Sequence, residues 1–95
     1  MKISNEKKEK IKEQILLFLF SSSPKPLFTL TIAKEIARDE EFVKNLLIDL
    51  KKKDLIIEIK KNPKGIIYLK RSRWKLADKT YQIYKKHQEN FNNYN

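Results

Sequence analysis

Basic residues are the feature of this sequence with the clearest chemistry, and they are concentrated in one stretch. The chain of 95 residues carries a formal net charge of +10. Residues 55–75 contain seven of the lysines and arginines and one acidic residue, which gives this stretch a charge of +6. Clustered cations of this kind are the electrostatic footprint of a surface that binds a polyanion. The sequence therefore predicts contact with nucleic acid, with a merely solvated surface as the alternative.

Residues that could support catalysis or hold a metal are scarce. The chain has no cysteine and a single histidine, His87, which has no adjacent Ser, Cys or carboxylate. It has no Gly-rich phosphate loop, because Gly65 is the only glycine. Neither a catalytic triad nor a metal site can be assembled from these residues. We predict a protein that is not an enzyme and needs no cofactor or metal, and no small-molecule ligand is evident.

The length allows one domain with one modest core. The apolar run at residues 15–20 has six residues, far fewer than the ~20 needed to cross a bilayer. The first residues are charged throughout and show no signal-peptide pattern. We therefore expect a cytoplasmic, nucleoid-associated protein with no membrane contact.

Apolar periodicity indicates the elements that must position the cations. Ile32 and Ile36 share one side of a short helix for which Thr29 is the expected N-cap. Asp39 is placed to cap the next helix, whose apolar stripe includes Leu46 and Leu50. We expect a single domain over 1–89, followed by a disordered tail over 90–95. In chain order its elements are a helix over 4–20, a linker over 21–26, helices over 29–38 and 40–53, a hairpin over 55–70 and a helix over 78–89. Ser4 is expected to cap the first helix and Asp78 the last.

After the third helix the apolar period changes from helical to strand-like. Two β-branched runs, 55–60 and 66–70, flank a turn that contains Pro63 and Gly65. Residues 27–29 are candidates for a short strand beside this hairpin. The predicted fold class is mainly α with a small β-hairpin (α+β), in which a three-helix core carries the hairpin and a C-terminal helix.

This order of elements resembles the winged helix-turn-helix superfamily, in which transcription regulators are the largest group. The resemblance covers roughly residues 11–86 and rests on the helix-turn-helix, the segment Lys53-Asp54-Leu55-Ile56, the hairpin and the sequence WKLADKTY. The third helix of the family often reads STVSRILKRLEEKGLI, and residues 42–56 match that pattern in register. The resemblance implies that residues 40–53 form a recognition helix and residues 55–70 a wing, and that the partner is double-stranded DNA.

The resemblance also implies a role for each outward residue of the recognition helix. Lys44 and Asn45 occupy the positions that touch bases in the major groove. Ile48 would suit a thymine methyl group or a protein partner, and Lys51 and Lys52 lie where phosphate contacts are expected.

The wing is expected to supply most of the remaining contacts with the DNA backbone. Trp74 is expected in the core, closing the hairpin onto the helices. The predicted wing contacts are Lys60, Lys61, Lys64, Lys70, Arg71 and Arg73, and the predicted secondary backbone contacts are Thr31, Lys34 and Arg38.

The start of the recognition helix departs from the family pattern. Asp39, Glu40 and Glu41 stand where regulators usually carry Ser, Thr, Arg or Gln. Three carboxylates repel phosphates, so binding is expected to depend on the wing, with little or moderate sequence specificity. Two alternatives remain: a protein-protein adaptor that docks through Glu40, Glu41 and Ile48, and an RNA-binding winged helix.

An apolar stripe on the last helix suggests self-association. Tyr81, Tyr84 and Phe91 recur at helical spacings, and the stripe extends beyond what a small core can cover. We predict a homodimer through the first and last helices, with Ile15, Leu19, Tyr81, Tyr84 and Phe91 at the interface. The alternative is that the stripe packs on its own domain.

Overall fold

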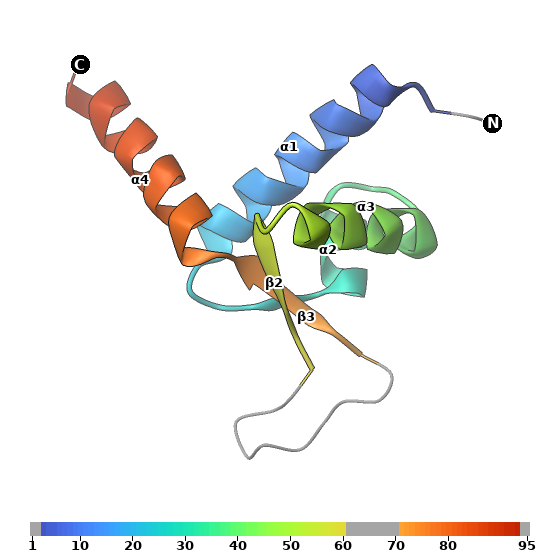
Figure 1. Cartoon of the computed structure of the whole chain (residues 1–95). Coiled ribbons are helices and arrows are strands. Elements are labelled where there is room, and N and C mark those ends of the chain that lie inside the picture. Colours follow the sequence, from blue (N-terminus) through green and yellow to red (C-terminus); the bar gives the residue numbers. More distant parts are fainter. Residues whose placement is uncertain (1–2, 61–70, 94–95) are drawn as a thin grey trace.

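The computed structural model describes residues 3–60 and 71–93. Figure 1 shows that α1 and α4 rise from the small sheet and diverge in a V, whereas α3 lies between α1 and α2. Within the described ranges the elements are α1 (Asn5–Ser22), β1 (Leu27–Phe28), α2 (Thr29–Glu35), α3 (Glu40–Lys52), β2 (Ile56–Ile59), β3 (Arg73–Leu76) and α4 (Asp78–Asn93).

Two of the helix starts agree with the caps expected from the sequence. The Ser4 hydroxyl accepts a hydrogen bond from the Lys7 amide at 3.2 Å, and the Asp39 carboxylate accepts one from the Phe42 amide at 3.1 Å. Such caps satisfy amides that have no partner within the helix. The Thr29 cap is wrong, because α2 begins at Thr29 itself and Phe28 precedes it without a side-chain cap.

The ends of α2 and α3 share one termination geometry. Ala37 and Asp54 both take a positive φ, 54° and 61°. The next amide then donates back into the helix, from Arg38 to the Ala33 carbonyl at 3.0 Å and from Leu55 to the Leu50 carbonyl at 3.1 Å. This is the Schellman arrangement. Consequently α2 ends three residues before the predicted end at 38, and α3 ends at 52 instead of 53.

The first and last helices are both longer than predicted. α1 continues to Ser22 and takes the first two residues of the expected linker 21–26, with the Ser21 hydroxyl donating to the Leu17 carbonyl at 3.1 Å. Pro24 and Pro26 follow and cannot continue a helix. α4 runs to Asn93, so the expected disorder from residue 90 is wrong for residues 90–93.

The three strands form one antiparallel sheet in the order β1-β3-β2. All four residues of β2 pair with β3, from Ile56 opposite Leu76 to Ile59 opposite Arg73. β3 is the partner of β2 within the described residues, and its alternate residues Trp74 and Leu76 are buried in the core. The predicted turn and return strand at 61–70 lie outside the described residues, so they stay predictions.

The core lies between the sheet and the three N-terminal helices. Its largest fully buried side chains are Trp74, Ile15, Leu19, Ile32, Leu47 and Val43. Trp74 is 1% exposed, and its indole Nε1 donates to the Thr29 hydroxyl at 2.8 Å. The Trp74 core prediction is confirmed, and the hydroxyl of Thr29 satisfies the buried indole instead of capping a helix.

Candidate nucleic-acid interface

The exposed residues of α3 supply part of the predicted DNA surface. Lys44, Asn45 and Lys52 are exposed, as base or phosphate contacts require. Ile48 is only partly exposed, because it packs against the hydrophobic core, and it is therefore a poorer docking residue than the sequence suggested.

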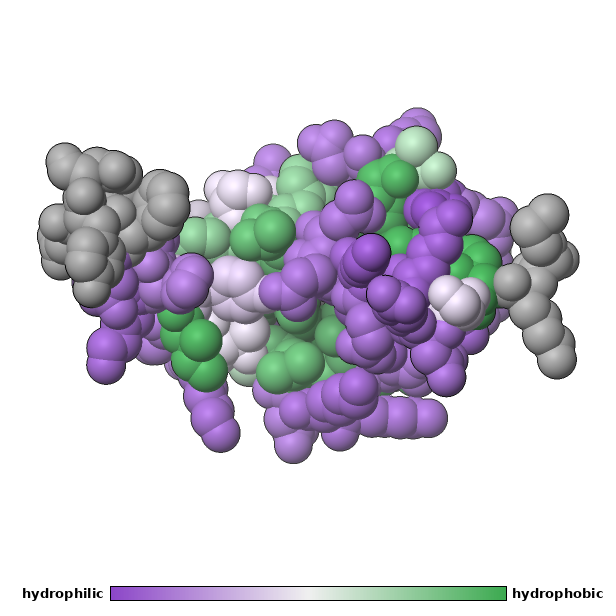
Figure 2. Space-filling model, turned by 90° about the horizontal axis from the view of Figure 1, so that it is seen from above, coloured by the Kyte–Doolittle hydropathy of each residue, from purple (hydrophilic) through white to green (hydrophobic). Residues whose placement is uncertain are grey.

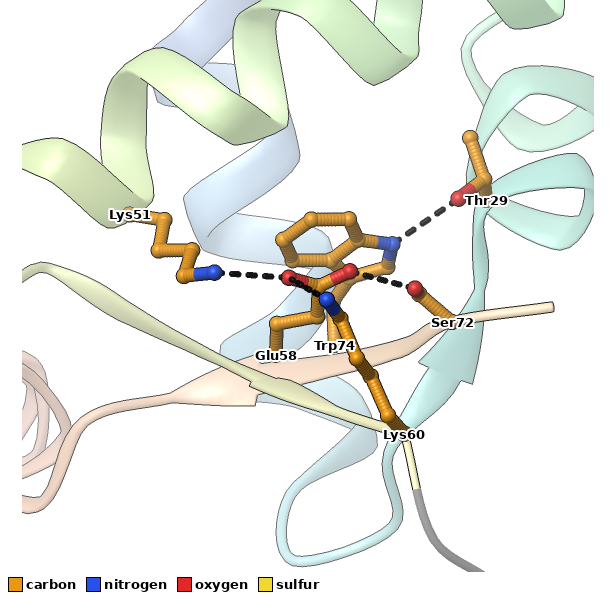
Figure 3. Close-up of polar contacts among 6 residues, drawn as sticks. All are labelled: Thr29, Lys51, Glu58, Lys60, Ser72 and Trp74. Atoms are coloured by element: carbon orange, nitrogen blue, oxygen red, sulfur yellow. Dashed lines mark hydrogen bonds and ion pairs between the residues drawn. The ribbon is translucent and has the colours of Figure 1, made fainter. Parts of the chain in front are cut away.

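Lys51 and Lys60 were both predicted as phosphate contacts, and both lie beside Glu58. Lys51 Nζ is 2.7 Å and Lys60 Nζ 3.9 Å from Glu58 Oε1, while the Ser72 hydroxyl donates to Oε2. Figure 3 shows these groups converging on one carboxylate from α3, β2 and the segment before β3. Lys51 thus joins α3 to β2, whereas Lys60 pairs with Glu58 from the same arm of the hairpin, and sequence spacing did not reveal either contact.

The environment of Glu58 keeps its carboxyl group ionised. Its side chain is 13% exposed. Burial by itself raises the pKa of Glu58, but hydrogen bonds from Lys51 and Ser72 and the charges of Lys51 and Lys60 outweigh it, so the pKa lies below its ordinary value. The carboxylate therefore offsets part of the local positive charge.

The two arginines before and within β3 have different surroundings. Arg71 is exposed, and its guanidinium lies 5.8 Å from the centre of the Phe28 ring. A cation over an aromatic face is attracted by the negative charge of that face. Arg73 is half-buried within β3. Arg71 is thus the more accessible of the two predicted wing contacts, and the DNA-binding role of both stays a prediction.

A cavity of about 300 Å³ lies where α2, α3 and the segment before β3 meet. We call it the junction cavity, and it is lined by Phe28, Thr31, Glu40, Lys44, Arg71 and Trp74, among others. It brings together three predicted DNA contacts, Thr31, Lys44 and Arg71, that are far apart in sequence. Sequence reasoning missed that Glu40 and Phe28 share this site, since only the fold places β1 beside Arg71.

The remaining predicted contacts are distributed unevenly. Thr31 and Lys34 are exposed on α2, and Arg38 is half-buried. Lys61, Lys64 and Lys70 lie outside the described residues, so their predicted role stays a prediction.

The predicted dimer residues divide into two groups. Ile15 and Leu19 are 0% and 1% exposed, so their assignment to an interface is wrong: they fill the core of their own chain. Tyr81 and Tyr84 are half-buried, and their rings lie 5.4 and 5.7 Å from that of Phe20. Phe91 lies in α4, outside the residues whose side chains are described.

An open groove of about 720 Å³ separates α1 from α4 and is lined by Leu17, Phe20, Ser21, Tyr81, Tyr84 and His87, among others. We call it the interhelix groove. Figure 2 looks onto the side where the two helices diverge and shows apolar residues between hydrophilic rims. At its edge the Tyr84 hydroxyl donates to Glu13 Oε1 at 2.9 Å. The pKa of Tyr84 is raised to about 12, mainly by burial and to a lesser extent by this hydrogen bond and the negative charge of Glu13.

The described residues contain no group of His, Cys, Asp and Glu arranged to hold a metal ion. In residues 3–60 and 71–93 no helix has the length and apolar character for a membrane span.

Comparison with known proteins finds similarity in structure only. No protein-family model matches the chain, and no curated protein matches it either. The chain resembles Staphylococcus aureus MepR in a MepR-DNA complex, with 22% identity over 96% of this chain and 66% of that one and a TM-score of 0.70. Lactococcus lactis ZitR gives 19% identity, 93% and 61% coverage and a TM-score of 0.68.

A smaller domain also matches. The Zalpha domain of Carassius auratus PKZ in complex with Z-DNA is 26% identical over 74% of this chain and 97% of that one, with a TM-score of 0.56. The chain spans 50–57% of the length of the first MepR structures that it matches. Together with the three-helix core, the order of the sheet and the hairpin base, these similarities show that the chain has the winged helix-turn-helix fold.

Proposed function

We propose that this domain binds double-stranded DNA and acts as a transcription regulator. The observation that carries the proposal is the junction cavity, where Lys44 of the recognition helix and Arg71 at the wing base line one site. Both side chains are exposed. The sequence of residues 55–75, which includes Arg71, has a net charge of +6. Cations on two elements that face one site are suited to a phosphate backbone.

The comparisons support the same proposal. MepR is a transcription regulator of a multidrug efflux pump and has been crystallised with DNA, and the Zalpha domain was crystallised with Z-DNA. We extend DNA binding to this chain because its cations lie on the helix and wing that define the fold. The carboxylates at the start of α3 favour weak or moderate sequence specificity.

A salt series of fluorescence anisotropy titrations with a labelled random duplex tests the proposal. We expect binding at ~50 mM salt and a fall in log affinity with log salt of about 0.9 per phosphate neutralised. Competition with structured RNA and with Z-form duplex identifies the preferred nucleic acid. Absence of binding to any duplex at low salt contradicts the proposal. Stronger DNA binding by a Glu40→Lys, Glu41→Lys variant supports it over the adaptor alternative.

We also propose that the protein is a homodimer through the interhelix groove. Leu17 lines this groove from α1 and is 52% exposed. Exposed apolar side chains beside an apolar groove are typical of a surface that a partner covers. A second copy is the occupant we propose, because a symmetric pair would cover the groove of each chain.

A further inference from the structure

The junction cavity contains a pair of cations and one carboxylate, and this combination suggests a more specific role than general attraction. Lys44 comes from α3, Arg71 from the segment before β3, and Glu40 from the first turn of α3. All three side chains belong to exposed residues. The two cations and the carboxylate together give these three side chains a net charge of +1.

We propose that one backbone phosphate of the bound DNA occupies the junction cavity, held by Lys44 and Arg71 together, and that Glu40 weakens this binding by direct repulsion. This inference rests on the proposed DNA binding and deepens it. It differs from the expectation that each cation neutralises a phosphate of its own.

The geometry around Arg71 favours a fixed contact. Its guanidinium lies 5.8 Å from the centre of the Phe28 ring, and Phe28 lines the same cavity. An aromatic face under a guanidinium restricts its motion and leaves the edge N–H groups available to oxygen acceptors. Thr29 and Thr31 line the cavity as well, and their hydroxyl groups can donate to phosphate oxygens.

Glu40 lies four residues before Lys44 and lines the same cavity. Two residues that far apart lie on one face of a helix. A carboxylate beside a phosphate raises the free energy of the complex, and a partly dehydrated site strengthens this effect. Glu41 is also exposed in the first turn of α3, but it does not line the cavity. Glu41 is therefore a matched control that has the same charge and nearly the same position.

A double-mutant cycle in DNA affinity tests the shared phosphate. Lys44→Ala and Arg71→Ala should each lower affinity about tenfold, and the double variant should lose much less than the product of the two because both cations act on one group. The slope of log affinity against log salt should decrease by about 0.9 in the double variant, compared with about 1.8 for two separate phosphates. Lys53→Ala removes an exposed cation that does not line the cavity, and it should show no coupling with either substitution.

The glutamate pair tests the repulsion. We expect Glu40→Gln to raise affinity about fivefold and Glu41→Gln to raise it less than twofold. Equal effects of the two substitutions would reduce Glu40 to a general contribution to charge and overturn that part of the proposal. Multiplicative losses in the cycle, or a change of about 1.8 in slope, would overturn the shared phosphate.

Trp74 provides a second readout that needs no variant. It is the only tryptophan of the chain, and it lines the cavity. Saturation with duplex should therefore change its emission in the wild-type protein, and unchanged emission at saturation would contradict the proposal. If the wild-type protein binds no duplex at low salt, the proposed function fails together with this inference. If the wild-type protein binds duplex but the affinity losses of the two single variants multiply in the double variant, only the proposed phosphate site fails.

Discussion

Glu58 is a nearly buried carboxylate that lies beside two lysines. Its side chain is 13% exposed, and Lys51 Nζ lies 2.7 Å away. It joins the end of α3 to β2, and through Ser72 to the segment before β3. Removing its charge would leave two ammonium groups close together without the anion between them. We therefore regard Glu58 as the residue that orients β2 and the segment before β3 relative to α3.

The substitution Glu58→Gln should lower the free energy of unfolding at pH 7 by about 1–3 kcal/mol. Because the folded pKa of Glu58 is depressed, its contribution to stability is present above the unfolded pKa of about 4.5 and is lost as pH falls through the lower folded pKa. The difference between wild type and variant should therefore shrink below about pH 4.5. Urea denaturation from pH 3 to 7 measures it.

Glu89→Gln is the control for this prediction, because Glu89 is exposed on α4. It should change stability by less than about 0.5 kcal/mol at every pH. A pH-independent difference for Glu58→Gln would mean that packing, and not charge, makes the contribution.

The elements show which parts of the fold local sequence can predict. Helix starts at Ser4 and Asp39 were predictable because a cap depends on the side chain at one position. The ends of α2 and α3 were not predictable in the same way. The residues with positive φ that terminate them are Ala37 and Asp54, and neither is the glycine that usually marks such an end. The pairing of residues 73–76 with β2 was not predicted, because this stretch lacks β-branched residues and the basic residues Arg73 and Lys75 alternate with the apolar ones. Burial of Trp74 selected β3 as the partner of β2, and burial depends on the whole core.

The same positive φ values predict an increase in stability at the helix ends. Ala37 is exposed and has φ 54°, a region that costs a residue with a Cβ about 1 kcal/mol. Ala37→Gly should therefore raise the free energy of unfolding by roughly 0.5–1 kcal/mol, a gain reduced by the greater freedom of glycine in the unfolded chain. Thermal and urea denaturation measure this change.

Ala33→Gly provides the comparison, because Ala33 is buried within α2. It should lower stability by about 1 kcal/mol or more. A loss of stability in Ala37→Gly would show that the C-terminal end of α2 does not keep its left-handed residue in solution.

At the scale of the molecule, the two faces with candidate functions are separate. The junction cavity lies by α2 and the start of α3, whereas the interhelix groove lies between α1 and α4. The sequence predicted that α1 and α4 form the association surface but selected Ile15 and Leu19 on α1. A helical stripe in sequence does not distinguish the side facing the core from the side facing a partner, and the two residues proved to be buried. The exposed residue Leu17 lies between them.

The proposed dimer predicts that a charge placed in the interhelix groove separates the subunits. Leu17 lines the groove and is 52% exposed, so Leu17→Asp leaves the core of the chain intact. In a dimer this position becomes covered, and an unpaired buried carboxylate costs several kcal/mol, which weakens association by at least about a hundredfold. Analytical ultracentrifugation at tens of micromolar should show the wild type at twice the 11.4 kDa chain mass and Leu17→Asp at the chain mass itself. Ile57→Asp makes the same change at a residue that is 42% exposed on β2, away from the groove, and it should remain dimeric. A wild-type protein that sediments only as a monomer contradicts the dimer, and dissociation by Ile57→Asp alone would move the interface to the sheet.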